Sequence, residues 1–126
     1  MVIGVGVDVV DIERFRTSLA RTPTMRTRVF TDVELDYVAP QLDQVPSLAA
    51  RFAAREAVMK AMGLGLGAFG FHDVWVEIDH DSGAPRLVVT GQAAKLAADR
   101  GIDSWHVSLS HDGGVATAMV VASRFS

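Results

Sequence analysis

The first apolar run of the chain covers residues 2–10 and is rich in β-branched side chains. A short run of this composition predicts a buried strand. Gly4 and Gly6 interrupt it, which indicates that another segment of backbone approaches the strand closely. Asp8 stands out because it is a carboxylate near the C-terminal end of this strand.

Two short helices are predicted next. Apolar side chains at an i, i+3, i+7 spacing predict a helix over 12–20, with its apolar stripe toward the core. Asp11 is its candidate N-cap, and Pro23 follows its end. A capping box over 31–34 predicts that a second helix begins near residue 32.

The longest predicted helix carries the sequence from Arg51 to Gly63, with Ser47 as its candidate N-cap. Its residues are mostly strong helix formers, and glycine is common just beyond a helix end. At about 100° per residue, Glu56, Lys60 and Gly63 lie on one side of this helix. Glu56 and Lys60 either form an ordinary surface ion pair, or they place an acid and a base beside Gly63. Because Gly63 has no side chain, a ligand could approach the backbone there.

The remaining predicted elements are a strand over 74–78, its hairpin partner over 86–90, an alanine-rich helix over 92–99, a strand over 104–110 and a final strand over 115–122. The last strand is apolar enough to be central in a sheet. This order of elements predicts an α+β fold, with a mainly antiparallel sheet packed on the long helix. We expect one compact domain over residues 1–126.

Composition narrows the class of protein. Of the 126 residues, 49% are hydrophobic and 21% are charged, as in a globular domain. Cysteine is absent, which excludes disulfides, thiolate metal sites and a cysteine nucleophile. The N-terminus lacks the basic start of a signal peptide, and no apolar run reaches the roughly 20 residues of a membrane span. We therefore expect a cytoplasmic protein without a membrane partner.

The charge is unevenly distributed. A net charge of −3 argues against general binding of nucleic acid. Eight of the 12 lysines and arginines nevertheless lie at or before Lys60, and the five arginines between positions 14 and 28 have no acid among them. Such a patch either attracts an acidic macromolecule or forms an ordinary solvated helix face.

Asp8 and Glu56 are the candidate metal ligands. Oxygen atoms from two separate elements suit Mg²⁺, which commonly binds one or two carboxylates and completes its shell with phosphates and waters. The alternative for Asp8 is a turn or capping residue. The four histidines form no zinc motif. His111, beside Ser110 at the start of a predicted turn over 111–114, is a candidate phosphate ligand, whereas His72 and His80 are expected to be core or surface histidines without a ligand.

Several motifs in order resemble the small 4′-phosphopantetheinyl transferases, the holo-[acyl-carrier-protein] synthase family. The family joins an early Gly-x-Asp and a later arginine to a Phe/Trp-x-x-Lys-Glu-Ala-x-x-Lys sequence. The matching segments here are Gly6-Val-Asp8 with Arg14, Arg28–Leu35, Phe52–Lys60, Ser82–Pro85 and His106–His111. One departure is Arg55, where the family usually has lysine; the charge is kept, so we expect the reaction to survive.

The resemblance implies the family's fold and activity. Members move the phosphopantetheine arm of coenzyme A to a serine of an acyl carrier protein, in a Mg²⁺-dependent reaction that releases adenosine 3′,5′-bisphosphate and supports fatty acid or polyketide biosynthesis. They are homotrimers with sites between subunits. Glu56 or a metal-bound water would then be the base that activates the serine.

The resemblance also assigns residues. Asp8 and Glu56 match the metal ligands, and Lys60 matches a lysine that contacts the pyrophosphate; these three are the expected catalytic residues. The expected coenzyme A site comprises Arg51, Lys60, Gly63, Pro85, Ser110 and His111. The arginines expected to meet an acidic helix of the carrier protein are Arg14, Arg21 and Arg28.

Two other functions compete with transfer. The same ligands could serve a Mg²⁺-dependent nucleotide pyrophosphohydrolase, in which water replaces the serine. The chain could also be an oligomeric module that binds coenzyme A or an acidic protein without catalysis. Transfer to a carrier protein and release of nucleotide without an acceptor distinguish the three.

Overall fold

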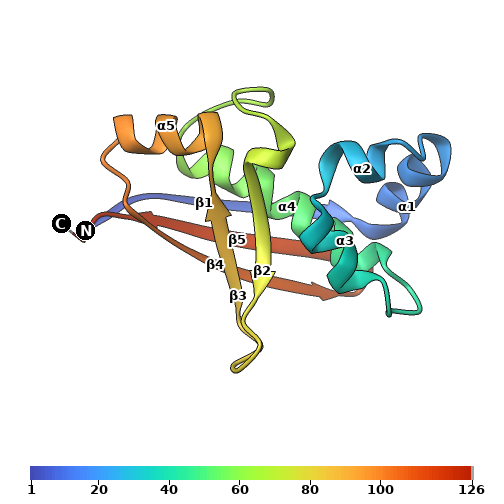
Figure 1. Ribbon diagram of the computed structural model, residues 1–126. Helices are drawn as coiled ribbons and strands as arrows, with labels where there is room; N and C mark the ends of the chain where they lie inside the picture. The colour runs from blue at the N-terminus through green and yellow to red at the C-terminus, as the bar shows by residue number, and fades with distance from the viewer. Residues whose placement is uncertain (126) are drawn as a thin grey trace.

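The computed structural model describes residues 1–125 and contains two antiparallel sheets with helices around them (Figure 1). Three strands form one sheet in the order β1-β5-β4, and a separate hairpin pairs β2 with β3. The long helix α4 lies on one face of the three-stranded sheet. The helices α1 to α3 gather at one end of the molecule, and α5 lies at the other. The α+β fold with antiparallel sheets is thus confirmed.

The elements follow one another along the chain as β1 Val2–Asp11, α1 Ile12–Arg21, α2 Met25–Val29, α3 Asp32–Val38, α4 Val45–Ala61, the short 3-10 helix η1 Phe71–Asp73, β2 Val74–Ile78, β3 Pro85–Val89, α5 Gly91–Asp99, β4 Ser104–Asp112 and β5 Val115–Ser123. The helix α2 was not predicted from the sequence. It has five residues, no side-chain cap and one buried side chain, so it lacks the periodicity that reveals longer helices.

Two glycines let β1 lie directly on α4. A Cβ atom placed on Gly6 would be 1.9 Å from the carbonyl oxygen of Ala57, and one on Gly4 would be 1.9 Å from that of Ala61. The predicted close approach is confirmed, and the partner backbone is the long helix. Because Gly4 meets Ala61 and Gly6 meets Ala57, the strand and the helix run in opposite directions, and β1 continues from Gly6 toward the middle of α4.

The three-stranded sheet has one buried and one exposed face. Toward α4 it presents Ala118, Val120 and Ala122 of β5, all completely buried, so the predicted central position of this strand is confirmed. The opposite face carries Val5, Val7 and Val9 of β1, which are 52–59% exposed, and Met119 pairs in register with Val7. The outer face is therefore apolar but uncovered within one chain.

A buried ion pair links α4 to α3. Arg55 and Glu34 have completely buried side chains, and the arginine Nη2 lies 2.6 Å from the glutamate Oε1. Arg55 also donates to Glu34 Oε2 and to the carbonyl oxygens of Phe71 and Arg51. Glu34 further accepts the backbone N–H groups of Thr31 and Val76. Every charge of the pair is thus compensated by hydrogen bonds, which a buried ion pair needs in order to be tolerated.

We expect Arg55→Lys to lower the free energy of unfolding by about 2 kcal/mol, because an ammonium cannot reproduce the fork of the guanidinium and leaves buried acceptors unpaired. For a domain of this size, the melting temperature should fall by roughly 5–10 °C. Thermal unfolding measures this. Arg86→Lys is the matched control, because Arg86 makes an exposed ion pair with Glu77. Equal stability of the two variants would contradict the role given to the buried pair.

Several helix boundaries test the predictions from the sequence. Asp11 caps α1 as predicted, accepting the N–H of Arg14 at 2.8 Å. Ser47 as the cap of α4 is wrong, since that helix begins at Val45. Pro46 occupies the first turn, where its missing N–H has no cost. The hydroxyl of Ser47 instead donates to Gln41 Oε1.

The end of one further segment agrees with the prediction, and the end of another does not. Gly63 follows α4 with φ of +70°, a conformation that suits glycine at a helix end, as predicted. The turn predicted over 111–114 is shorter than expected, because β4 continues through Asp112. His111 is thus a strand residue.

Candidate active site

A cleft of about 390 Å³ lies between the end of β1, the helix α1 and the middle of α4. Asp8 and Glu56 both line it. Lys60 reaches over from the next turn of α4, and its Nζ lies 3.0 Å from Asp8 Oδ1 and 3.1 Å from the carbonyl oxygen of Val7. The predicted meeting of the strand end with the middle of the long helix is therefore confirmed.

Glu56 is the electrostatically unusual member of this group. Its Oε1 is buried and has no hydrogen-bond partner among the described residues. Burial raises the pKa of the Glu56 carboxyl, and the nearby charge of Asp8 raises it further, whereas the charge of Lys60 acts in the opposite direction. A carboxylate left without a donor is costly to keep ionised. The cleft therefore favours a cation from outside the chain.

Two carboxylates and a lysine suit a phosphate-bound Mg²⁺ better than a metal held by protein alone. No group of three or more His, Asp or Glu side chains in residues 1–125 could hold a metal ion. Mg²⁺ needs no such group, because it often takes one or two carboxylates and fills its shell with waters and substrate phosphates. The unpartnered Glu56 oxygen beside Asp8 fits this pattern.

The other wall of the cleft is largely apolar. Phe15 of α1 and Phe52 of α4 line it, with ring centroids 5.4 Å apart. Met25 and Ser18 complete this wall, and Arg14 also lines the cleft. The sequence indicated that Phe15 faces the core, but the spacing could not show that Phe15, Ser18 and Met25 lie beside the two carboxylates. That proximity depends on the packing of α1 and α2 against α4.

The other expected ligand-binding residues do not line this cleft. Gly63 lies one turn beyond Lys60, at the end of α4, whereas Arg51 lies buried near its start. Pro85 begins β3 in the separate hairpin. Ser110 and His111 lie on β4, and the central strand β5 separates them from β1. One chain thus brings together the expected catalytic residues but distributes the expected coenzyme A residues over several surfaces.

The arginines near the N-terminus divide into two sets. Arg16 pairs with Glu13 and Asp43, and Arg26 donates to Gln44. The side chains of the other three, all exposed, make no hydrogen bond or ion pair within residues 1–125: Arg14, Arg21 and Arg28. These are the three arginines that the resemblance assigned to a partner, and they are free to meet one.

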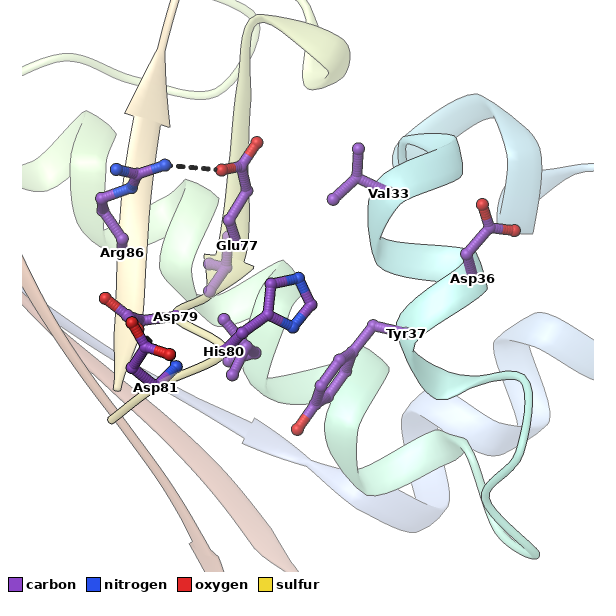
Figure 2. A pocket seen from close by; sticks show the side chains of 10 residues that line it. Val33, Asp36, Tyr37, Glu77, Asp79, His80, Asp81 and Arg86 are labelled. Carbon is purple, nitrogen blue, oxygen red and sulfur yellow. Dashed lines mark hydrogen bonds and ion pairs between the residues drawn. The ribbon is translucent and has the colours of Figure 1, made fainter. Parts of the chain in front are cut away.

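A larger hollow of about 750 Å³ lies between α3 and the β2–β3 hairpin (Figure 2). Tyr37 of α3 faces His80 and the acidic hairpin across it. Several carboxylates line it, and among them only Glu77 forms an ion pair, with Arg86. A volume alone does not mark an active site, and the paired acid-base chemistry lies in the smaller cleft.

Fold and cleft together describe an α+β protein in which two acids and a lysine suit a cation bound to phosphate. A profile of the 4′-phosphopantetheinyl transferase superfamily matches residues 4–120. The chain belongs to this superfamily and is a transferase, which confirms the resemblance recognised in its motifs. Within residues 1–125, no helix is long and apolar enough to cross a membrane.

Named relatives agree over almost the whole chain. The holo-[acyl-carrier-protein] synthase of Streptomyces avermitilis is 55% identical, over 96% of this chain and 97% of the relative. The holo-[acyl-carrier-protein] synthase of Micrococcus luteus is 51% identical, over 98% of this chain and 94% of the relative. The crystal structure of the Neisseria meningitidis synthase superposes with a TM-score of 0.87 at 30% identity, covering 98% of this chain and all of the other. The structure of a synthase–coenzyme A complex named for Chronobacterium ammoniagenes superposes with a TM-score of 0.82 at 30% identity, covering 98% of each chain.

Proposed function

We propose that this protein transfers the 4′-phosphopantetheine group of coenzyme A to a serine of an apo acyl carrier protein and releases adenosine 3′,5′-bisphosphate. The observation that carries the proposal is the buried Glu56 oxygen, which has no hydrogen-bond partner within residues 1–125 and lies in the same cleft as Asp8 of the Asp8–Lys60 pair. The names of the relatives and the coenzyme A complex of one of them support the same substrates. Such a reaction fits a cytoplasmic role in fatty acid or polyketide biosynthesis.

Asp8 and Glu56 would hold Mg²⁺ in this reaction. The ion would polarise the pyrophosphate and stabilise the charge that develops on the leaving oxygen. Lys60 is positioned to add a positive charge on the same side, since its Nζ already lies at Asp8. Either Glu56 or a water held by the ion would accept the serine proton.

The decisive experiment measures the intact mass of an apo carrier protein after incubation with this protein, coenzyme A and Mg²⁺. A gain of one phosphopantetheine group is the expected result, and no gain would reject the transfer. A parallel reaction without carrier protein tests the hydrolase alternative. Rapid release of adenosine bisphosphate in that reaction would favour hydrolysis. Binding of coenzyme A with neither product would favour a non-catalytic module.

We further propose a homotrimer with a coenzyme A site between subunits. The apolar outer face of the β1-β5-β4 sheet provides a surface to cover, and large exposed apolar surfaces commonly mark such contacts. A site shared by two chains would also explain why Ser110 and His111 lie away from Asp8 and Glu56. In this arrangement, the residues of β4 serve the cleft of a neighbouring subunit.

Val7→Lys should therefore yield a monomer with little activity, because the lysine would place a charge in the proposed interface. Light scattering should report about 13.5 kDa for the variant and three times this mass for the unmodified protein. Ala98→Lys, on the exposed side of α5, changes the charge equally and should keep the trimer. A trimeric Val7→Lys variant would contradict this interface.

The three unpaired arginines are the proposed docking surface for the carrier protein. Charge reversal in Arg14→Glu or Arg28→Glu should raise the KM for the carrier about fivefold to tenfold at low salt, with a smaller effect on the KM for coenzyme A. The difference should shrink as salt increases, because exposed charges are screened. Lys95→Glu on α5 carries the same charge change and should leave both values unaltered. Unchanged carrier KM in the α1 and α2 variants would count against this surface.

A further inference from the structure

The three residues of the short 3-10 helix η1 each bond to a different part of the molecule. The carbonyl oxygen of Phe71 accepts the Nε of Arg55 from α4 at 2.8 Å. The carbonyl oxygen of Asp73 accepts the backbone N–H of Thr90, the N-cap residue of α5, at 2.7 Å. His72 lies between these two and bonds to α2. Because η1 is held at both ends, it can in turn hold a third element in place.

The bond from His72 ends on a carbonyl group at the end of a helix. The ring Nε2 lies 2.8 Å from the carbonyl oxygen of Thr27, and because a carbonyl only accepts, Nε2 carries the proton. Thr27 belongs to the last turn of α2, where carbonyl groups have no donor within the helix. His72 therefore caps the C-terminal end of α2 from a segment that lies 45 residues further along the chain.

The helix α2 depends on such contacts for its position. It has five residues, no side-chain hydrogen bond at its N-cap and one buried side chain, Val29. Its other side-chain bond to a distant segment is that of Arg26, which donates to Gln44 Oε1 at the start of α4. A helix this short is not stable through its own hydrogen bonds and is held by tertiary contacts. The bond to His72 therefore contributes directly to where α2 lies.

Arg28 is the side chain whose place depends on this bond. It directly follows Thr27, it is exposed, and it belongs to the proposed docking surface for the carrier protein. The other side of η1 bonds to Arg55, which precedes Glu56 on α4. Through η1, the backbone that carries the docking arginine is thus connected to the helix that carries a proposed metal ligand.

We propose that His72 is a positioning residue for the docking of an acidic carrier protein, because its bond to Thr27 holds Arg28 at a fixed place relative to the cleft. This role rests on the proposed function. Without the bond, α2 would have to be ordered by the partner on binding, and that ordering reduces affinity. The groups in the cleft would be unaltered. Weaker binding that is equal in the ground state and the transition state raises KM and leaves kcat unchanged.

His72→Ala should therefore raise the KM for the carrier protein about fivefold at low salt, as expected for the loss of one hydrogen bond. The kcat and the KM for coenzyme A should stay unchanged. His72→Gln should bring the carrier KM back to within about twofold, because the glutamine amide can donate to the same carbonyl oxygen. His80→Ala removes an exposed histidine from the turn between β2 and β3, and it is the control that should change neither KM.

A double-mutant cycle distinguishes the positioning of Arg28 from a general loss of stability. In an Arg28→Gln background, His72→Ala should have no further effect on the carrier KM. In an Arg14→Gln background it should keep its full effect, because Arg14 lies on α1.

Three results would each overturn the proposal: an unchanged carrier KM in His72→Ala, no recovery in His72→Gln, or an equal effect of His72→Ala in both arginine backgrounds. An unchanged carrier KM in Arg28→Glu would reject the docking surface and this proposal with it. Absence of any transfer by the unmodified protein would instead reject the proposed function.

Discussion

Glu56→Gln should lower kcat/KM for phosphopantetheine transfer by about a thousandfold while leaving the protein folded. The amide keeps the shape of the side chain but removes the negative charge that would hold Mg²⁺ and accept a proton. Asp8→Asn should have a similar effect, because Asp8 supplies the second carboxylate of the cleft. The intact-mass assay run as a time course measures both losses.

Glu56→Gln should not lower the stability of the fold, and this result would distinguish a functional acid from a structural one. Folding raises the pKa of the Glu56 carboxyl, so the ionised group opposes folding at neutral pH. This opposition fades as the pH falls through the raised pKa toward the ordinary value for glutamate. Without divalent ions, Glu56→Gln should therefore melt at the same or a higher temperature than the unmodified protein at pH 7, and the difference should shrink at lower pH.

Metal binding provides the matching control. Mg²⁺ should raise the melting temperature of the unmodified protein, because a ligand that binds only the native state stabilises it. It should have little effect on Glu56→Gln. Asp99→Asn, an exposed carboxylate at the end of α5, should retain activity and the response to Mg²⁺. Full activity of Glu56→Gln, or an equal Mg²⁺ response in that variant, would remove the metal assignment.

Gly6→Ala should prevent folding. The added Cβ would lie 1.9 Å from the carbonyl oxygen of Ala57 and 2.9 Å from the amide nitrogen of Ala61, both backbone atoms that cannot rotate aside. Strand β1 or helix α4 would have to move apart, which would open the core between them. Because native domains are stable by only about 5–15 kcal/mol, we expect an insoluble or unfolded product.

Circular dichroism and thermal unfolding measure this effect. Gly65→Ala is the matched control, because a Cβ at that loop position meets no atom within 4 Å. The control should fold and keep its melting temperature within a few degrees. A Gly6→Ala variant that melts cooperatively near the temperature of the unmodified protein would mean that β1 and α4 can separate without damage, contrary to the packing described above.

Sequence patterns predicted those features that depend on neighbours along the chain. The cap at Asp11 and the hairpin of β2 and β3 are local, and each was predicted from a few residues. The start of α4 was wrong because Ser47 and Pro46 each mark a helix start, and the pattern does not say which applies. The partner of Arg55 could not be predicted, since Glu34 lies 21 residues away and contacts it only after α3 and α4 pack.

The candidate site shows the same difference between features that are local in the sequence and features that depend on packing. Asp8 and Glu56 were candidates because each was unusual in its own element, and the structure places both in one cleft. Spacing could not predict that Lys60 would bond to Asp8, or that Glu56 would lack a partner, because both follow from how β1 crosses α4. The roles of Pro85, Ser110 and His111 depend on an arrangement of subunits that no pattern within one chain encodes, and they stay predictions.

The hydrogen bonds of Glu34 have a consequence for how this chain can evolve. One carboxylate there accepts from the start of α3, from the Val76 amide of β2 and from both ends of the Arg55 fork. A change of Arg55 to lysine would leave several acceptors without donors at once. Such a change would be tolerated only alongside compensating replacements nearby. We therefore expect substitutions at position 55 to be coupled to substitutions at the residues around it.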